Sequence, residues 1–373
     1  MHLRYLVAAI GISWSAMGAA QANQEQNHPF KIEALAKFEG PWSMTFLPGT
    51  SKALVTEQSG KLYLWEEGKA KIDVAGVPAV WFAEHGGFAD VIAHPKFADN
   101  KIIYMSYAEP GEADTRGTVV ARAKLVTNGN SARLEDVKVI WRQVPKVTGG
   151  GQFGARMAFS PDGYLFISSG DRVKFEPAID TSVNLGKIIR LTENGEIPAS
   201  NPYYGTSPIT AQIWSVGHRD PLGLAFDAEG RLWEHEMGPK GGDEFNLIER
   251  SRYYGWPVVS NGDHYDGQPI ARHSTRTDFV APQITWDDLA PAGLMIYSGN
   301  LFPQWKGSAF LGGLAGQSIV RVELNGAQAR QADRWAMGAR IREVEQGPEG
   351  AIYVLEDGRH GSQGRLLRLT PKK

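Results

Sequence analysis

The chain has 373 residues, no cysteine, 39 basic and 41 acidic side chains, and a formal net charge of -2. The lack of cysteine excludes disulfides, thiolate metal sites, a cysteine nucleophile and a lipoprotein anchor. The balance of charge, without any run rich in lysine or arginine, speaks against nucleic acid as a partner. The 43 glycines and 11 tryptophans, with little helical periodicity, indicate many short strands joined by tight turns.

The first 22 residues have the pattern of an export signal. A basic start is followed by an apolar stretch over residues 5–19 and by Ala20-Gln21-Ala22, a small-x-small cleavage pattern. The apolar stretch holds about 15 residues, fewer than the roughly 20 that an uncleaved membrane-spanning helix would need. We therefore expect a signal peptide over residues 1–22, a periplasmic location, and a mature domain over residues 23–373 with no membrane span.

One unit recurs along the mature chain: an apolar strand, a turn rich in Pro, Asp and Gly, a second strand, and a third strand that opens with Gly-x-apolar-x-Arg. The third and sixth copies are the clearest, with turns at residues 160–163 and 347–350. The six copies begin near residues 42–46, 90–93, 156–159, 223–226, 293–297 and 342–344. Each unit therefore takes roughly 55 to 60 residues, which allows for long loops.

A strand predicted over residues 32–38 precedes the first unit and is placed to complete the sheet of the last one. Closing a ring in this way removes exposed strand edges. The sequence thus predicts an all-β protein, a six-bladed β-propeller of four-stranded antiparallel blades. A pair of β-sandwiches is the alternative, but six units with one internal order favour the propeller.

Charged residues gather in loops next to the innermost strand of each unit, where the funnel of a propeller opens. Arg219, Arg340 and Arg342 would converge there from different units. Guanidinium groups bind planar polyanions well, so the three together indicate an anionic ligand. The alternative for each arginine alone is a pairing with a carboxylate such as Glu343 or Asp220.

A glycine-rich turn in the fourth unit is a candidate metal site. Gly238-Pro239 and the following Gly241-Gly242-Asp243-Glu244 offer backbone carbonyls and two carboxylates, the hard oxygen ligands that suit calcium. A plain solvated turn would have the same composition. The pattern does not match an EF-hand loop.

Several segments, in their order along the chain, resemble the pyrroloquinoline-quinone (PQQ)-dependent glucose/sorbosone dehydrogenase family, especially its bacterial aldose sugar dehydrogenases. The resemblance covers about residues 38–369. Its most telling segments are Gly154-Ala155-Arg156, Gly217-His218-Arg219-Asp220-Pro221, Gly238-Pro239-Lys240-Gly241-Gly242-Asp243-Glu244, Tyr254-Gly255-Trp256-Pro257 and Arg340-Ile341-Arg342-Glu343.

The resemblance implies a quinone held over the funnel of a six-bladed propeller, with the carbonyls of Gly238 and Pro239 sharing a calcium ion with it. It implies that the cofactor contacts are Arg156, Arg219, Asp220, Arg340 and Arg342. Aldose sugars would be oxidised at the anomeric carbon to lactones, with hydride passing to the calcium-bound quinone. A periplasmic electron acceptor would then reoxidise the cofactor.

Three positions depart from the family pattern. Gln152 stands where the family has its general base, a histidine oriented by the residue that matches Asp171. An amide cannot take a proton at neutral pH. Asp220 replaces an asparagine beside the quinone, and Ala315 replaces a lysine found in some members.

The motif Glu84-His85-Gly86-Gly87 stands where the family has Gly-Gln-Gly-Gly. His85 comes from a neighbouring unit and is a candidate replacement for the base, beside the space that Gln152 leaves.

Two other functions remain open. The first is a non-catalytic propeller that binds a sugar or a small anion, favoured by Gln152, Asp220 and Ala315. The second is a calcium-dependent lactonase-type hydrolase, because a fold alone does not determine function. It would need a cage of carboxylates, with candidates at Asp90, Asp171, Asp220, Glu236 and Asp243.

Overall fold

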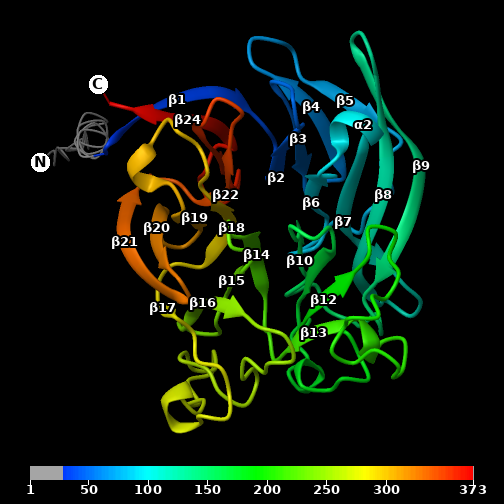
Figure 1. The fold of residues 1–373 in the computed structure, drawn as a ribbon, viewed down its shortest axis with the longest axis vertical. Coiled ribbons are helices and arrows are strands. Elements are labelled where there is room, and N and C mark those ends of the chain that lie inside the picture. The colour runs from blue at the N-terminus through cyan, green and yellow to red at the C-terminus, as the bar shows by residue number, and fades with distance from the viewer. Residues whose placement is uncertain (1–27, 373) are drawn as a thin grey trace, which may run out of the picture.

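The computed structural model describes residues 28–372, so the predicted signal peptide lies outside the described residues. This part of the chain is almost entirely β-structure, arranged as four sheets of four strands and one sheet of eight (Figure 1). Its helical elements are the short helix α2 (Phe97–Asn100) and four single-turn 3-10 segments. Among residues 28–372, no helix has the length and apolar character needed to cross a membrane.

The four smaller sheets each consist of consecutive antiparallel strands, except that the last one also takes in the first strand of the chain. Three of them are formed by β10 (Gly154–Phe159), β11 (Leu165–Ser169), β12 (Lys187–Leu191) and β13 (Ile213–Val216); β14 (Pro221–Phe226), β15 (Leu232–Glu236), β16 (Asp243–Ile248) and β17 (Ile284–Trp286); β18 (Pro291–Ile296), β19 (Ala309–Gly313), β20 (Ser318–Asn325) and β21 (Gln328–Ala336). The fourth is formed by β22 (Ile341–Gln346), β23 (Ile352–Glu356), β24 (Arg365–Pro371) and β1 (Phe30–Lys37).

The eight-stranded sheet consists of two antiparallel runs of four strands. The runs are β2 (Pro41–Phe46), β3 (Lys52–Glu57), β4 (Lys61–Glu66) and β5 (Ile72–Ala75), and β6 (Phe88–Ala93), β7 (Ile102–Pro110), β8 (Arg116–Asn128) and β9 (Ser131–Arg142). A short parallel pairing joins the last strands of the two runs, Val74 with Ala132 and Ala75 with Arg133. Of the six separate sheets that we expected, four are observed as separate sheets. The other two are joined, because the long β8–β9 hairpin reaches the edge strand β5 of the preceding run.

The first strand of each run lies at the centre of the molecule. Strands β2, β6, β10, β14, β18 and β22 contact one another in cyclic order, and β22 contacts β2 (Figure 1). Each of the six has a register irregularity close to its start. Such bulges redirect side chains. The same irregularity at the same place in six strands gives the centre a repeating lining.

The first strand of the chain completes the last sheet, as the sequence predicts. Strand β1 pairs antiparallel with β24, from Phe30 opposite Pro371 to Lys37 opposite Arg365. Phe30 of this strand is 1% exposed and packs edge-on against Trp335 of β21 and against Trp305, which lies in the 3-10 segment between β18 and β19. The closing strand therefore binds two sheets, one by its backbone and one by a side chain.

The hydrophobic core is divided into layers between neighbouring sheets. One such layer combines Tyr104 and Val120 of the second run with Met157, Ile167 and Ile189 of the third. Burial of apolar surface in these layers is the main favourable term in folding. The layers hold the sheets face to face around a centre that both apolar and polar side chains line.

We expect Phe30→Ala to lower the free energy of unfolding by about 3 to 5 kcal/mol, because it removes a buried aromatic ring and leaves a cavity between two tryptophans. Urea unfolding followed by tryptophan fluorescence measures this change. The exposed neighbour Lys31 provides the matched control, and Lys31→Ala should change stability by less than about 0.5 kcal/mol. Equal effects of the two substitutions would contradict the closing role of this strand.

Candidate functional site

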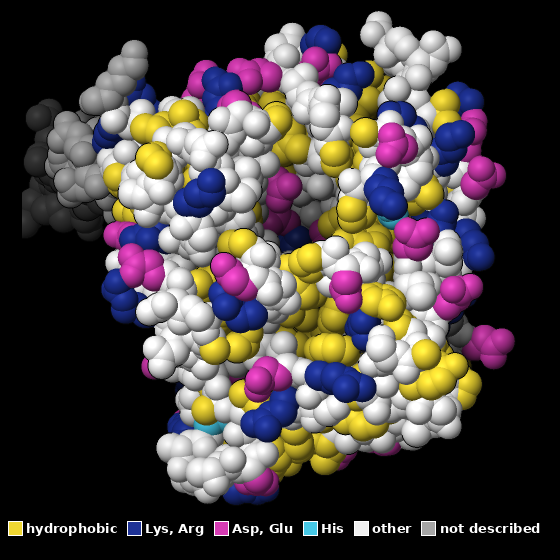
Figure 2. Space-filling model, viewed as in Figure 1, with side chains coloured by type: hydrophobic (Ala, Val, Ile, Leu, Met, Phe, Trp, Pro, Cys, Tyr) yellow, Lys and Arg dark blue, Asp and Glu magenta, His cyan; other side chains and the backbone are white. Residues whose placement is uncertain are grey.

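A cavity of about 460 Å³ opens at the centre of the ring. Figure 2 shows this face hollowed near its middle, with acidic and basic side chains inside the hollow. Five residues from the irregular starts of the inner strands line the cavity, Trp42, Ala89, Ala155, Leu222 and Arg342. The ionisable side chains of the lining are Glu84, His85, Asp220, Arg340, Arg342, Arg359 and His360. The repeated bulges thus supply part of the cavity wall, and loops supply most of its charge.

One carboxylate holds three of these cations. Asp357 accepts hydrogen bonds from Nε of Arg340 at 2.9 Å, from Nε and Nη2 of Arg342 at 2.9 and 2.8 Å, and from Nη2 of Arg359 at 3.3 Å. Burial alone would raise the pKa of Asp357, but the charges of Arg342 and Arg359 outweigh it and hold that pKa below its usual range. Three guanidinium groups around one carboxylate leave an excess of positive charge, which favours an anionic ligand.

Asp220 is the buried acid of the cavity. Its Oδ1 accepts a hydrogen bond from the backbone N–H of Gly154 at 3.1 Å. Burial raises the pKa of Asp220, and the positive charges of His85 and Arg219 offset only part of that shift. The raised pKa favours the protonated carboxyl, which is neutral and can donate a hydrogen bond as the family's asparagine amide does.

The structure brings Gln152 and Asp171 together, as expected for the catalytic pair of the family. The backbone N–H of Val173 donates to Oε1 of Gln152 at 3.2 Å and to Oδ1 of Asp171 at 2.8 Å. Trp256 Nε1 donates to Oδ2 of Asp171 at 2.7 Å, and burial raises the pKa of Asp171 to about 6. Neither Gln152 nor Asp171 lines the cavity, whereas the neighbouring Phe153 does.

Arg156 does not line this cavity and is held by protein groups, although its buried Nη2 has no hydrogen-bond partner among residues 28–372. It forms ion pairs with Glu343 and with Asp90, its Nε donates to the carbonyl of Leu222 at 2.9 Å, and its guanidinium stacks on Trp42. It lines a smaller cavity of about 150 Å³ with those two carboxylates. Arg156, which the resemblance implies is a cofactor contact, therefore joins inner strands to one another. Its partner Glu343 is the carboxylate that the sequence analysis considered for Arg219, Arg340 or Arg342.

Arg219 occupies the turn that was expected to bind calcium. Its Nη1 donates to the carbonyls of Met237 and Gly238, at 2.9 and 2.6 Å. Asp243 accepts from the backbone N–H groups of Gly238 and Ala290, at 3.0 and 2.7 Å. The carbonyl of Gly238 thus already faces a cation, and Asp243 faces backbone donors instead of the carbonyls.

The sequence analysis did not single out Asp357, Arg359 or His360. A signal was present in the repeat, because Asp357 follows the second strand of the last unit much as Asp171 follows the second strand of the third. Placing the two units side by side would have marked Asp357 as a second buried loop carboxylate. The charged residues after it would then have been candidates for the cavity wall.

Comparison with known proteins identifies the family. The model of the glucose/sorbosone dehydrogenase family matches residues 38–368. The chain belongs to this family. It is 36% identical to the aldose sugar dehydrogenase YliI of Escherichia coli K12, over 99% of this chain and 98% of that protein. Membership accounts for the segments that resemble these enzymes.

Two solved structures share the fold. The soluble aldose sugar dehydrogenase of E. coli in its apo-form superimposes with a TM-score of 0.87 at 36% identity, over 92% of this chain and 100% of that one. The PQQ-bound aldose sugar dehydrogenase of Streptomyces coelicolor gives a TM-score of 0.73 at 25% identity, over 92% and 98% of the two chains. Both structures are named as aldose sugar dehydrogenases, which are oxidoreductases that act on sugars.

We expect the stability of the protein to depend on pH through Asp171. Its pKa is raised from 3.8 to about 6 in the folded protein. The folded state therefore binds this proton more tightly than the unfolded state, and the stabilisation present below about pH 4 is lost as the pH rises through 6. Relative to Asp171→Asn, the wild type should lose about 3 kcal/mol of unfolding free energy between pH 4 and pH 7. Urea unfolding at a series of pH values measures the difference.

The exposed Asp99→Asn substitution is the control for this experiment and should leave the wild-type pH profile unchanged. Parallel pH profiles for wild type and Asp171→Asn would mean that Asp171 titrates as it does in the unfolded chain.

Proposed function

We propose that the protein is a PQQ-dependent oxidoreductase that oxidises aldose sugars to lactones, with the six runs of strands acting as six blades of a propeller around the cofactor cavity. The observation that carries this proposal is the cavity with Arg340, Arg342 and Arg359 held by a single Asp357. The match to the family and the likeness to a PQQ-bound aldose sugar dehydrogenase support it.

The residues around the cavity fit the quinone. Its carboxylates need cationic donors, and the cavity supplies a net positive cluster in which the buried Nε of Arg359 has no hydrogen-bond partner within the described residues 28–372. Arg219, at the adjoining turn, also has a buried Nε without a partner among residues 28–372. Burial raises the pKa of Asp220, which lowers the cost of placing an anionic ring beside this carboxyl. The chain thus offers several donors that an anionic ring would satisfy.

Calcium fits less well than the quinone. The Gly238 carbonyl accepts from Arg219 Nη1 at 2.6 Å, so a calcium ion at this carbonyl would compete with a guanidinium group. The carboxylates of Asp243 and Glu244 are bonded to backbone N–H groups and to Asn246. The carbonyls of Gly238 and Pro239 remain the calcium ligands that the family resemblance implies, but Arg219 competes for the first of them, and we derive no step from the ion.

Held by Arg340, Arg342 and Arg359, the quinone would supply an acceptor for the hydride on the anomeric carbon of the sugar. The protein must orient the sugar and accept the proton of the anomeric hydroxyl. Gln152 cannot accept it. His85 lines the cavity and lies near the buried carboxyl of Asp220, so His85 is our candidate for the proton acceptor. Asp171, bonded to Trp256, would hold the wall beside Gln152 in place.

The alternatives fare differently. A non-catalytic protein that binds a sugar or small anion in the same cavity would use the same arginines, and Gln152 favours it. The lactonase alternative needs its carboxylates in one place. Among residues 28–372, the only group of three or more possible metal ligands contains Glu236 but none of the other four candidate carboxylates. The structure therefore gives the lactonase no specific support.

For the whole protein we propose export to the periplasm, removal of residues 1–22, and reoxidation by a periplasmic electron acceptor. The basis is the sequence pattern of the N-terminus.

The binding of the cofactor can be tested directly. Titration of the purified mature protein with PQQ should show saturable binding, and Arg342→Gln should weaken it at least about tenfold, because a buried charge contact is lost. Arg330→Gln, which removes an exposed arginine paired with Glu323, is the control and should leave binding unchanged. Absence of binding by the wild type would end the dehydrogenase proposal and leave the non-catalytic one.

The identity of the proton acceptor can be tested by substitution. With quinone bound and an aldose added, reduction followed by absorbance should be slow in the wild type, and Gln152→His should accelerate it by about 10² to 10⁴. His85→Ala should lower the residual rate of the wild type without weakening quinone binding. A wild-type rate that neither substitution alters would place the proton acceptor elsewhere.

A further inference from the structure

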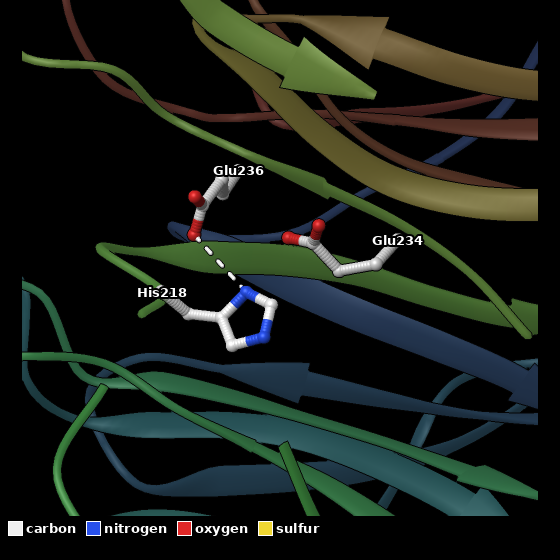
Figure 3. A group of neighbouring side chains, drawn as sticks. All are labelled: His218, Glu234 and Glu236. Carbon is white, nitrogen blue, oxygen red and sulfur yellow. Dashed lines mark ion pairs between the residues drawn. The ribbon is translucent and has the colours of Figure 1, made fainter. Parts of the chain in front are cut away.

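A cluster of three buried side chains lies beside the loop that carries Arg219 and Asp220. His218 directly precedes Arg219 in the chain. Glu234 and Glu236 are alternate residues of β15, so their side chains point to the same face of the sheet. His218 and Glu234 are 0% exposed and Glu236 is 3% exposed. One nitrogen or oxygen of each lies within 4.8 Å of the others, and Figure 3 shows the three groups turned toward one another.

Each member of the cluster is fixed from outside. Ser215 Oγ lies 2.8 Å from Nε2 of His218, Asn246 Nδ2 donates to Oε2 of Glu234 at 3.0 Å, and the backbone N–H of Arg219 donates to Oε2 of Glu236 at 2.7 Å. A metal-binding histidine typically has its second ring nitrogen held by such a neighbour. The three side chains therefore have defined positions.

The inner atoms of the cluster lack partners. Nδ1 of His218 and Oε1 of Glu234 are buried and make no hydrogen bond in the described part of the chain, and neither does Oδ1 of the adjacent Asn246. Oε2 of Glu236 lies 3.8 Å from Nδ1 of His218, beyond hydrogen-bonding distance. Leaving buried polar atoms unsatisfied costs free energy, so such a group of acceptors indicates a missing donor or cation.

The charge of the cluster also lacks compensation. Within residues 28–372, neither Glu234 nor Glu236 forms an ion pair with a lysine or arginine side chain, and Glu244 lies opposite Glu236 on β16. Buried carboxylates are normally paired or bound to a metal ion. A divalent cation would neutralise two of them at once.

We propose that His218, Glu234 and Glu236 bind one divalent transition-metal ion, with Zn²⁺ as the expected ion. An imidazole nitrogen with two carboxylate oxygens is a donor set that Zn²⁺ accepts, whereas calcium prefers six or more oxygens. Ligand atoms around zinc lie about 3 to 4 Å apart, so a small movement of side chains already within 4.8 Å closes the site.

The ion would have a structural role. It would bind the loop at His218 to β15. The backbone of the next residue, Arg219, would be held as well, because its N–H already donates a hydrogen bond to Glu236. This site is separate from the proposed calcium ligands Gly238 and Pro239, and it does not depend on the quinone. Binding to the folded protein alone would stabilise it.

The test is metal content and thermal stability of the tag-free mature protein, without quinone. After removal of metals with a chelator and incubation with Zn²⁺, elemental analysis should find about one zinc per folded chain. Zinc should raise the melting temperature by roughly 3 to 5 °C. His218→Leu and Glu234→Gln should each abolish both effects; the second is isosteric and keeps the fold testable by circular dichroism.

His94→Gln is the matched control, because it removes another buried histidine, one whose Nε2 bonds Glu193 at 2.7 Å. It should keep the bound zinc. Zinc retained equally by His218→Leu and Glu234→Gln would overturn the assignment, and so would a folded wild type that retains no zinc, since protons would then hold the cluster. Binding of calcium alone, undisturbed by His218→Leu, would overturn it as well.

Discussion

The pairing of β1 with β24 is the contact on which the arrangement of the molecule depends. It joins the first described strand to the last, so that the sheet containing β22 is complete and its inner strand can contact β2. Without β1, β24 would present an open edge that invites association with other chains. The cavity exists because six inner strands are held around one centre, and that closure is made at a single strand pair.

The centre of the ring is held by charge. Arg156 on β10 bonds Asp90 on β6 and Glu343 on β22, so one buried guanidinium connects three inner strands that are far apart in sequence. Removing one member of such a group leaves uncompensated buried charge and is strongly destabilising. The family resemblance of the segment around Arg156 thus has a structural explanation as well as a functional one.

Much of the fold could be predicted because each unit repeats the same order of strand, turn and strand, and the observed β10, β11 and β12 lie where that order places them. The parallel pair β5 and β9 could not be predicted, since Val74 and Ala132 belong to different units and no repeat relates them. For the site, the sequence analysis named Arg340 and Arg342, which line the cavity, but it named neither Arg359 nor the shared partner Asp357. A bulge between Ile341 and Glu343 changes the direction of neighbouring side chains, so Arg342 turns to Asp357 while Glu343 turns to Arg156.

The cluster of Arg340, Arg342 and Arg359 on Asp357 also determines which solution conditions influence the cavity. Arginines remain protonated across the physiological range, and Asp357 is held ionised by the charges around it. The attraction that this cluster exerts on an approaching anion is therefore nearly constant with pH. Dissolved salt acts differently, because at physiological ionic strength charges are screened beyond about 8 Å. The contribution of this cluster to the rate at which anions enter the cavity therefore depends more on ionic strength than on acidity.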